Sequence, residues 1–248
     1  NTEETISGIN DAISNELDWA VISSGGKLIS YAEKHKKPYI KIPKGLQPRA
    51  AFGYLTQAVC KYIDLVENTN YLDEIKSAGE YLNNILEEKE NAEIYINSKE
   101  LAKKINKKTC VIYGGTPLTE LVSGRWKTQI NENAKSKAYV GSMPEVHHNE
   151  ILSWDANPAS SKNDYALIFL RDLEEHPQIK KRFELTEKLL GDKVDIYNIE
   201  TKTSDSLLKK MMELVLFGDL FSISLSDELG MIPEDIEGIE NLKEMLGD

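Results

Sequence analysis

The densest group of polar side chains that could do chemistry lies between Pro144 and Glu150. His147, His148 and Asn149 occupy the middle of this segment, directly before the carboxylate. A carboxylate held by neighbouring imidazole and amide groups can act as a general base. The spacing matches neither HExxH nor a Cys/His pattern, which argues against a metal site. A hydrogen-bonded loop without chemistry is the alternative that the residue types leave open.

An arginine closes the rigid turn Gly45–Arg49, which reads GLQPR. The apolar spacing after this turn predicts a helix over residues 46–68, with Arg49 in its first turn. A cation in the first turn opposes the helix dipole, so an anionic ligand would explain its presence. The alternative is a surface arginine paired with a local carboxylate.

Two glycine-containing turns follow apolar runs that resemble strands: residues 23–26 (SSGG) and residues 113–116 (YGGT). The first of them contains Ser24 and Gly25. In an open parallel sheet such turns lie where ligands bind, and their backbone N–H groups suit phosphate. Plain tight turns are the alternative for both. Neither turn has the GxGxxG or GxxxxGK[ST] pattern of nucleotide sites.

Two further titratable residues are candidates. His176 opens a predicted helix after a strand, and imidazole titrates near neutrality, so this residue could shuttle a proton. A helix-capping role is the alternative for it. Lys243 lies on an acidic helix near the C-terminus, where a solvated lysine is the ordinary expectation. The sequence contains no local Ser/His/Asp or Cys/His nucleophile signature.

Alternating strands and helices would position these residues. The predicted strands cover residues 19–24, 38–43, 109–115, 139–142, 165–171 and 194–200. Helical segments between them predict parallel sheets covered by helices on both faces. Residues 71–106 are charged and helical, which is typical of a solvated helical hairpin. The pattern restarts near Lys107, so we expect two α/β units in tandem, with domains at residues 1–90 and 91–248.

Composition excludes several classes of protein. The 248 residues carry 30 Lys and Arg against 41 Asp and Glu, a net charge of −11 that argues against nucleic-acid binding. Only Cys60 and Cys110 are present, which fits a reducing compartment, and we expect a cytoplasmic protein. No apolar run reaches the roughly 18 residues of a membrane span, so no membrane partner is expected. The chain opens at Asn1 without a methionine, and we expect no signal peptide.

Several stretches carry a resemblance to one family. They are VISSGGKL (21–28), GLQPRAA (45–51), RWKTQINENAK (125–135), PEVHHNEI (144–151) and LRDLEEHPQIKKRFELT (170–186). In order and spacing the chain resembles the bifunctional phosphoglucose/phosphomannose isomerases of the sugar isomerase (SIS) superfamily. The resemblance runs from Asn1 to Lys243. It implies an α/β fold of two tandem SIS domains, each a five-stranded parallel sheet flanked by helices.

The resemblance also implies a reaction and its participants. The reaction is the interconversion of glucose 6-phosphate and mannose 6-phosphate with fructose 6-phosphate. No metal or organic cofactor is expected. The partners expected are the sugar phosphate and a second copy of the chain, in a homodimer whose active sites use residues of both subunits. A non-catalytic SIS protein that binds a sugar phosphate as a regulator is the alternative function.

Residue roles follow from the matching motifs. Glu150 resembles the base that moves a proton between C1 and C2, and Arg49 resembles the cation that stabilises the enediolate. His176, offered by the partner subunit, and Lys243 resemble the residues that open the sugar ring. The substrate-binding residues that we expect are Thr2, Ser24, Gly25, Arg49 and His148.

The sequence departs from the family pattern in two places. Of a Ser-x-Ser-Gly-Asn-Thr phosphate segment only Asn1 and Thr2 remain, so we expect a first domain that is incomplete at its N-terminus. For a truly truncated chain we expect an exposed sheet edge and little activity. Glu234 or Asp235 stands where the family often carries a threonine that helps to admit mannose 6-phosphate. Activity on glucose 6-phosphate is therefore the firmer expectation.

Overall fold

The computed structural model describes residues 3–246 of the chain. It shows a mixed α/β protein in which parallel strands are flanked by helices, as the sequence predicts. The chain forms two compact units. Unit 1 contains the residues up to Lys76 and those from Glu237 onward, and unit 2 spans Ser77–Ile236. The expected boundaries of the two SIS domains, residues 1–90 and 91–248, stay a prediction.

Unit 1 is built around a two-stranded parallel sheet. β1 (Val21–Ser23) pairs with β2 (Tyr39–Lys41), and Val21 lies opposite Tyr39. Its complete helices are α1 (Glu3–Ser14), α2 (Gly26–Lys34), α3 (Phe52–Glu67) and α10 (Glu237–Leu246). A small core of Ile9, Val21 and Ala32 holds the sheet against α1 and α2. Partly buried apolar side chains, among them Ile13 and Leu28, pack against this core.

The charged stretch folds as α4 (Tyr71–Ile85), the short 3-10 helix η1 (Lys89–Asn91) and α5 (Glu93–Ile105). Helices are present as predicted, but the prediction of a solvated segment is wrong for α5. Ile94, Leu101 and Ile105 are buried on one face of this helix, because apolar residues recur there at helical spacing. That face packs against α9 (Leu207–Leu229) within unit 2.

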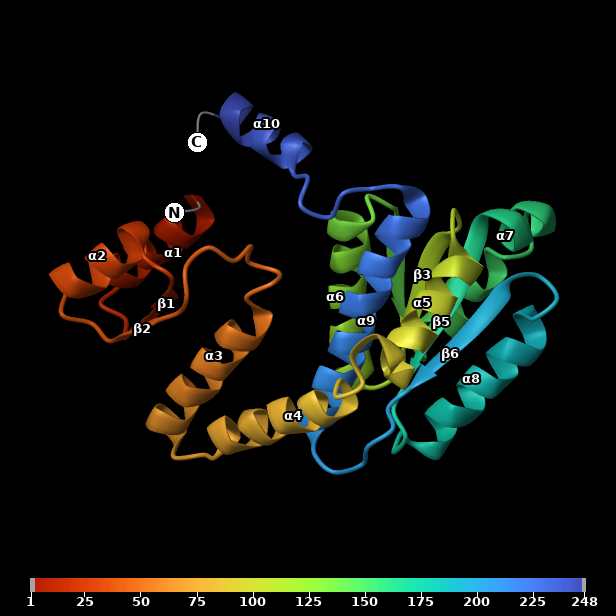
Figure 1. Cartoon of the computed structure of the whole chain (residues 1–248), viewed down its shortest axis with the longest axis horizontal. Helices are drawn as coiled ribbons and strands as arrows, with labels where there is room; N and C mark the ends of the chain where they lie inside the picture. Colours follow the sequence, from red (N-terminus) through yellow and green to blue (C-terminus); the bar gives the residue numbers. More distant parts are fainter. Residues whose placement is uncertain (1–2, 247–248) are drawn as a thin grey trace. The chain divides into compact units, whose positions relative to one another are not determined.

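Unit 2 contains a four-stranded parallel sheet in the order β4-β3-β5-β6. Its strands are β3 (Thr109–Gly114), β4 (Ala138–Ser142), β5 (Tyr165–Arg171) and β6 (Asp195–Glu200). Helices α5, α6 (Pro117–Asn133) and α9 lie on one side of the sheet, and α7 (Pro158–Asp164) and α8 (Pro177–Leu190) lie on the other (Figure 1). The resemblance implied five strands, whereas four pair among the described residues of this unit.

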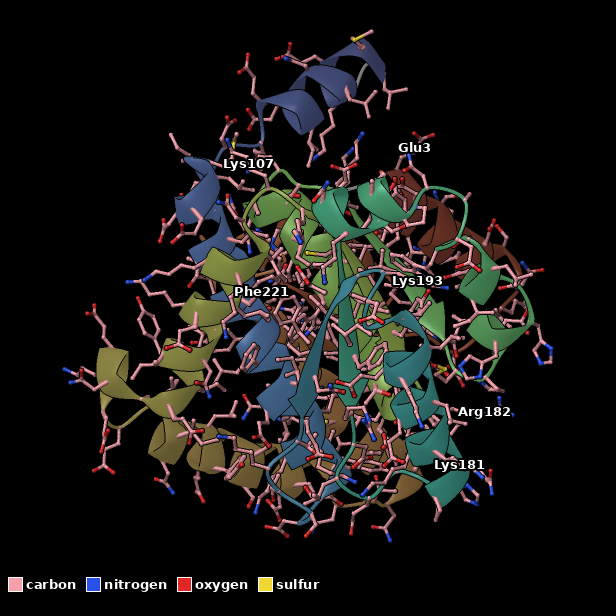
Figure 2. The ribbon with its side chains drawn as sticks, turned by 90° about the vertical axis from the view of Figure 1, so that its right-hand side faces the viewer. Glu3, Lys107, Lys181, Arg182, Lys193 and Phe221 are labelled. Atoms are coloured by element: carbon pink, nitrogen blue, oxygen red, sulfur yellow. The ribbon has the colours of Figure 1, made fainter. Side chains whose placement is uncertain are left out.

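The motif at residues 125–135 lies on α6 and packs against α9. Trp126 is buried, donates its indole N–H to the Leu214 carbonyl at 2.8 Å and stacks on Phe221, which Figure 2 labels on α9. Gly218 permits this contact, since a Cβ at that position would lie 2.3 Å from Trp126 Nε1. Trp126 therefore contributes to the core of unit 2.

Candidate active site

The cluster predicted at residues 144–150 follows β4 directly. It folds as two short 3-10 helices, η2 (Glu145–His148) and η3 (Glu150–Leu152), rather than as one regular helix. Asn149 explains the break. Its backbone is non-helical, with φ −147° and ψ −66°, and its side-chain oxygen accepts the Glu150 N–H at 2.6 Å. Glu150 therefore begins a new turn after the break.

His147 fastens this segment to α8. Arg182, on α8 in Figure 2, places Nη1 3.0 Å from His147 Nδ1. His147 Nε2 lies 2.7 Å from Thr186 Oγ1. Since Arg182 can only donate, Nδ1 accepts and Nε2 carries the proton that goes to Thr186. Burial first, then Arg182 and His148, lower the pKa of His147, so the neutral ring holds the segment.

Glu150 is half-buried and receives a hydrogen bond from the core of the sheet. Tyr113 Oη donates to Glu150 Oε2 at 3.0 Å. Burial raises the pKa of Tyr113, and the nearby Glu150 carboxylate raises it further. The prediction that neighbouring imidazole and amide groups hold this carboxylate is wrong, because His147 bonds to α8 and the Asn149 oxygen binds the backbone.

A cavity of about 570 Å³ opens beside the Glu150 carboxylate. Its walls combine aromatic rings with a few polar groups, and the lining includes Tyr113, Lys127, Glu150, Trp154, Asn157 and Ser160. Trp154 Nε1 is buried and makes no hydrogen bond among the described residues. The cavity thus presents a carboxylate beside aromatic walls to a polar ligand.

His176 lies in the same unit as Glu150, at the start of α8. Its Nδ1 accepts the backbone N–H of Gln178 at 3.1 Å, so it caps the helix. The capping alternative is therefore realised, and Nε2 is the atom that remains for proton transfer. Sequence reasoning left both roles open, and this geometry allows them together.

Ion pairs fix the loop between β5 and His176. Arg171 donates to Glu175 through Nε at 2.9 and 3.0 Å, and its guanidinium lies 4.5 Å from the Phe183 ring centroid. Lys210 donates to Asp172 at 3.0 Å and to Glu174 at 3.0 Å. Burial alone would lower the pKa of Lys210, but these two carboxylates raise it. Ion pairs therefore hold both the start of the loop, at Asp172, and its end, at Glu175.

In unit 1 the turn at residues 23–26 joins β1 to α2. Ser23 Oγ accepts the Gly25 N–H at 3.3 Å and donates to the Gly25 carbonyl at 2.9 Å. Gly25 has φ 155°, and no side chain caps the helix that follows. Lys44 lies beside this turn, since a Cβ on Gly25 would be 3.6 Å from Lys44 Nζ. Sequence reasoning missed Lys44, although it directly precedes the GLQPR motif.

The other glycine turn, at residues 113–116, is closed by its own helix. Thr119 Oγ1 accepts the N–H of Gly115 at 2.9 Å and that of Thr116 at 3.0 Å. A Cβ on Gly114 would lie 2.6 Å from the Glu120 nitrogen. Here the alternative of a plain tight turn holds, because close packing and capping account for the glycines.

The remaining predicted residues lie on other elements than Glu150. Arg49 is half-buried in the turn before α3, which begins at Phe52, so the prediction that it lies in the first helical turn is wrong. Lys243 is exposed on α10, and His148 is exposed on η2. Thr2 lies outside the described residues.

The structure thus places Glu150 and His176 in unit 2, and Arg49, Ser24, Gly25 and Lys243 in unit 1. Between residues 3 and 246, no three His, Cys, Asp or Glu side chains gather in a way that could hold a metal ion. Across that same range, no helix combines the length and apolar character needed to cross a bilayer.

Comparison with known proteins identifies the family. Residues 96–246 match the bacterial phospho-glucose isomerase C-terminal SIS domain. The bifunctional phosphoglucose/phosphomannose isomerase of Aquifex aeolicus (strain VF5) is 34% identical over 247 residues, which cover 99% of this chain and 73% of that protein. The protein of the same name from Caldicellulosiruptor bescii is 34% identical over 258 residues, covering 100% and 74%.

The fold agrees with a solved structure. A hypothetical protein from Thermus thermophilus superposes with a TM-score of 0.72 at 15% identity, over 99% of this chain and 68% of that one. At this identity the likeness speaks for the fold alone. The sequence matches carry the assignment, and the chain belongs to the bifunctional phosphoglucose/phosphomannose isomerase family.

Proposed function

We propose that this chain interconverts glucose 6-phosphate and mannose 6-phosphate with fructose 6-phosphate. The observation that carries the chemical part of the proposal is the Glu150 carboxylate, bonded through Oε2 to Tyr113 and facing a cavity. The named activity of the relatives supports the same reaction. A protein that only binds a sugar phosphate would have no use for a base held in this way.

Glu150 is the proposed base of the isomerisation. It takes the C2 proton of the open-chain aldose, O2 loses its proton as O1 gains one, and the proton returns to C1. One carboxylate suffices, because only one carbon-bound proton moves. Glucose 6-phosphate and mannose 6-phosphate differ only at C2, so loss of that proton gives both the same enediolate. This shared intermediate accounts for the two activities in the family name.

Arg49 is the proposed partner of the enediolate oxygen. A fixed positive charge at a developing oxyanion lowers the barrier by about 3 kcal/mol in a water-poor site. With a net charge of −11, the protein as a whole repels an anionic substrate, so capture depends on local cations and backbone donors. Ser24, Gly25, His148 and Thr2 are proposed to bind the substrate, and Lys44 joins them beside the Gly25 turn.

Ring opening is assigned to His176 and Lys243. Opening the hemiacetal needs an acid at the ring oxygen and a base at the anomeric hydroxyl. Nε2 of His176 is suited to one of these tasks because Nδ1 is used by the helix cap. We propose that His176 acts across the interface of a homodimer. The tandem pair of SIS domains and the cytoplasmic location belong to the same proposal.

A coupled assay tests the function. The full-length protein is supplied with glucose 6-phosphate or mannose 6-phosphate, and fructose 6-phosphate is measured. We expect turnover with both, and a fall in kcat of about a thousandfold in Glu150→Gln, since general base catalysis contributes about 10² to 10⁴. Glu145→Gln, on the same segment, is the control and should retain activity. Binding of either sugar phosphate without turnover would favour the regulatory alternative.

A further inference from the structure

Tyr113 lies at the C-terminal end of β3, where no sequence motif assigns it a role. It is almost fully buried, yet its phenolic oxygen reaches the half-buried carboxylate of Glu150 at 3.0 Å. Among the described residues no other group bonds to that carboxylate, so Oε1 is left for a ligand. A carboxylate held by one oxygen and open at the other has its reactive atom fixed in direction.

The ring of Tyr113 is itself fixed by the sheet. Gly141 of β4 and Phe169 of β5 are its register partners on the two neighbouring strands. The ring stacks on Phe169 with centroids 6.1 Å apart. It also crosses Gly141 so closely that a Cβ there would lie 2.6 Å from Tyr113 Cε1. Three strands therefore determine where the hydroxyl points.

The backbone of the Glu150 segment is held by α8. His147 bonds to Arg182 and Thr186 on α8, which fixes the backbone before Glu150 but not its side chain. The side chain of Glu150 has only the Tyr113 hydroxyl for orientation among the described residues. Removing that hydroxyl would leave the base attached to a fixed backbone with a free carboxylate.

We propose that Tyr113 is a positioning residue that aims the Glu150 carboxylate through a hydrogen bond to Oε2 and leaves Oε1 for the substrate. This inference rests on the proposed isomerase function. It adds a residue that acts through the base and does not touch the substrate. The phenol donates in the ground state and keeps its proton throughout the reaction, because burial and the adjacent carboxylate disfavour phenolate.

The test is Tyr113→Phe in the full-length protein, which keeps the ring and its packing. We expect kcat for glucose 6-phosphate to fall about tenfold, as one charge-assisted hydrogen bond implies, while KM changes by less than about twofold. Tyr197→Phe, on β6 and away from Glu150, is the matched control and should leave kcat and KM unchanged.

A second measurement does not depend on activity. In a double-mutant cycle of Tyr113→Phe and Glu150→Gln, the losses in Tm should not add if the two groups interact. Additive losses, or an unchanged kcat in Tyr113→Phe beside an inactive Glu150→Gln, would overturn the inference and leave the isomerase function standing. If the wild-type protein isomerises neither sugar phosphate, the proposed function fails, and the Tm cycle still decides whether Tyr113 holds Glu150.

Discussion

Two glycine turns that look alike in the sequence differ in the structure. The turn at residues 113–116 is filled by its own helix, because Thr119 Oγ1 accepts two of its N–H groups and Gly114 packs on the α6 backbone. The turn at residues 23–26 precedes a helix without a side-chain cap and has Lys44 beside it. Glycines after a strand therefore serve packing in one unit, and in the other they precede a helix whose first N–H groups no side chain caps.

The difference shows which sequence signal tells the two turns apart. In the turn at residues 113–116 the signal is the threonine at the third helical position, Thr119, which forms a capping box with Thr116. In the turn at residues 23–26 the position three residues after Gly25 is Leu28, whose side chain cannot cap a helix. An anion-binding turn is better indicated by a missing cap than by its glycines.

Gly114→Ala should disrupt the closed turn at residues 113–116, and we expect it to have the largest effect on stability. The new Cβ would lie 2.6 Å from the Glu120 nitrogen and 2.7 Å from the Thr119 carbonyl carbon, and neither backbone atom can move without shifting α6. We expect the free energy of unfolding to fall by about 3 kcal/mol. Urea unfolding followed by circular dichroism measures it. Gly124→Ala, in open space on α6, is the control, and equal stability of both variants would show that the turn is not tightly packed.

Thr119→Val should open the same turn without a steric clash. The substitution leaves the N–H groups of Gly115 and Thr116 without their acceptor, and the loss should be about 2 kcal/mol. Thr119→Ser keeps the hydroxyl and should retain most of the stability. KM for glucose 6-phosphate is expected to stay unchanged in both variants. A raised KM would place a ligand at this turn and remove the contrast between the two glycine turns.

The sequence predicted the elements that rest on strong apolar patterns. The runs TCVIYGG and YALIFLR became β3 and β5, because strands buried on both faces need continuous apolar residues. It did not predict that Tyr113 reaches Glu150, which depends on β3 and β4 lying in register. It also placed the start of α3 too early, since the local turn at residues 47–51 competes with the helix.

Among the site residues, too, local signals were predicted and tertiary contacts were missed. His176 was placed correctly at a helix start, because a strand followed by His-Pro is a local signal. The Lys44 side chain could not be assigned to the Gly25 turn from sequence, because it reaches that turn only after β1 and β2 pair. Pairings between distant residues are set by tertiary packing, and local propensity does not encode them.

Gly25→Ala should test the open turn through binding rather than stability. Gly25 has φ 155°, which strains a residue with a Cβ, and the new methyl would lie 3.3 Å from Lys44 Cε. We expect KM for glucose 6-phosphate to rise about tenfold, which corresponds to about 1.4 kcal/mol of lost binding. Gly53→Ala, in open space on α3, is the control and should leave KM unchanged. An unaltered KM in Gly25→Ala would mean that phosphate binds elsewhere.

Lys44→Met should give the smallest effect. It separates an effect of the Gly25 turn from an effect of net charge. The side chain is exposed, so its attraction for a phosphate is screened by salt, and KM should rise about threefold at low ionic strength. In about 1 M salt, where the Debye length is about 3 Å, the wild type and the variant should converge. Lys61→Met, an exposed lysine on α3, removes the same charge away from the turn and should leave KM unchanged at low salt. A rise in KM that is equal in both variants would assign the effect to net charge, and a rise confined to Lys44→Met would assign it to the Gly25 turn.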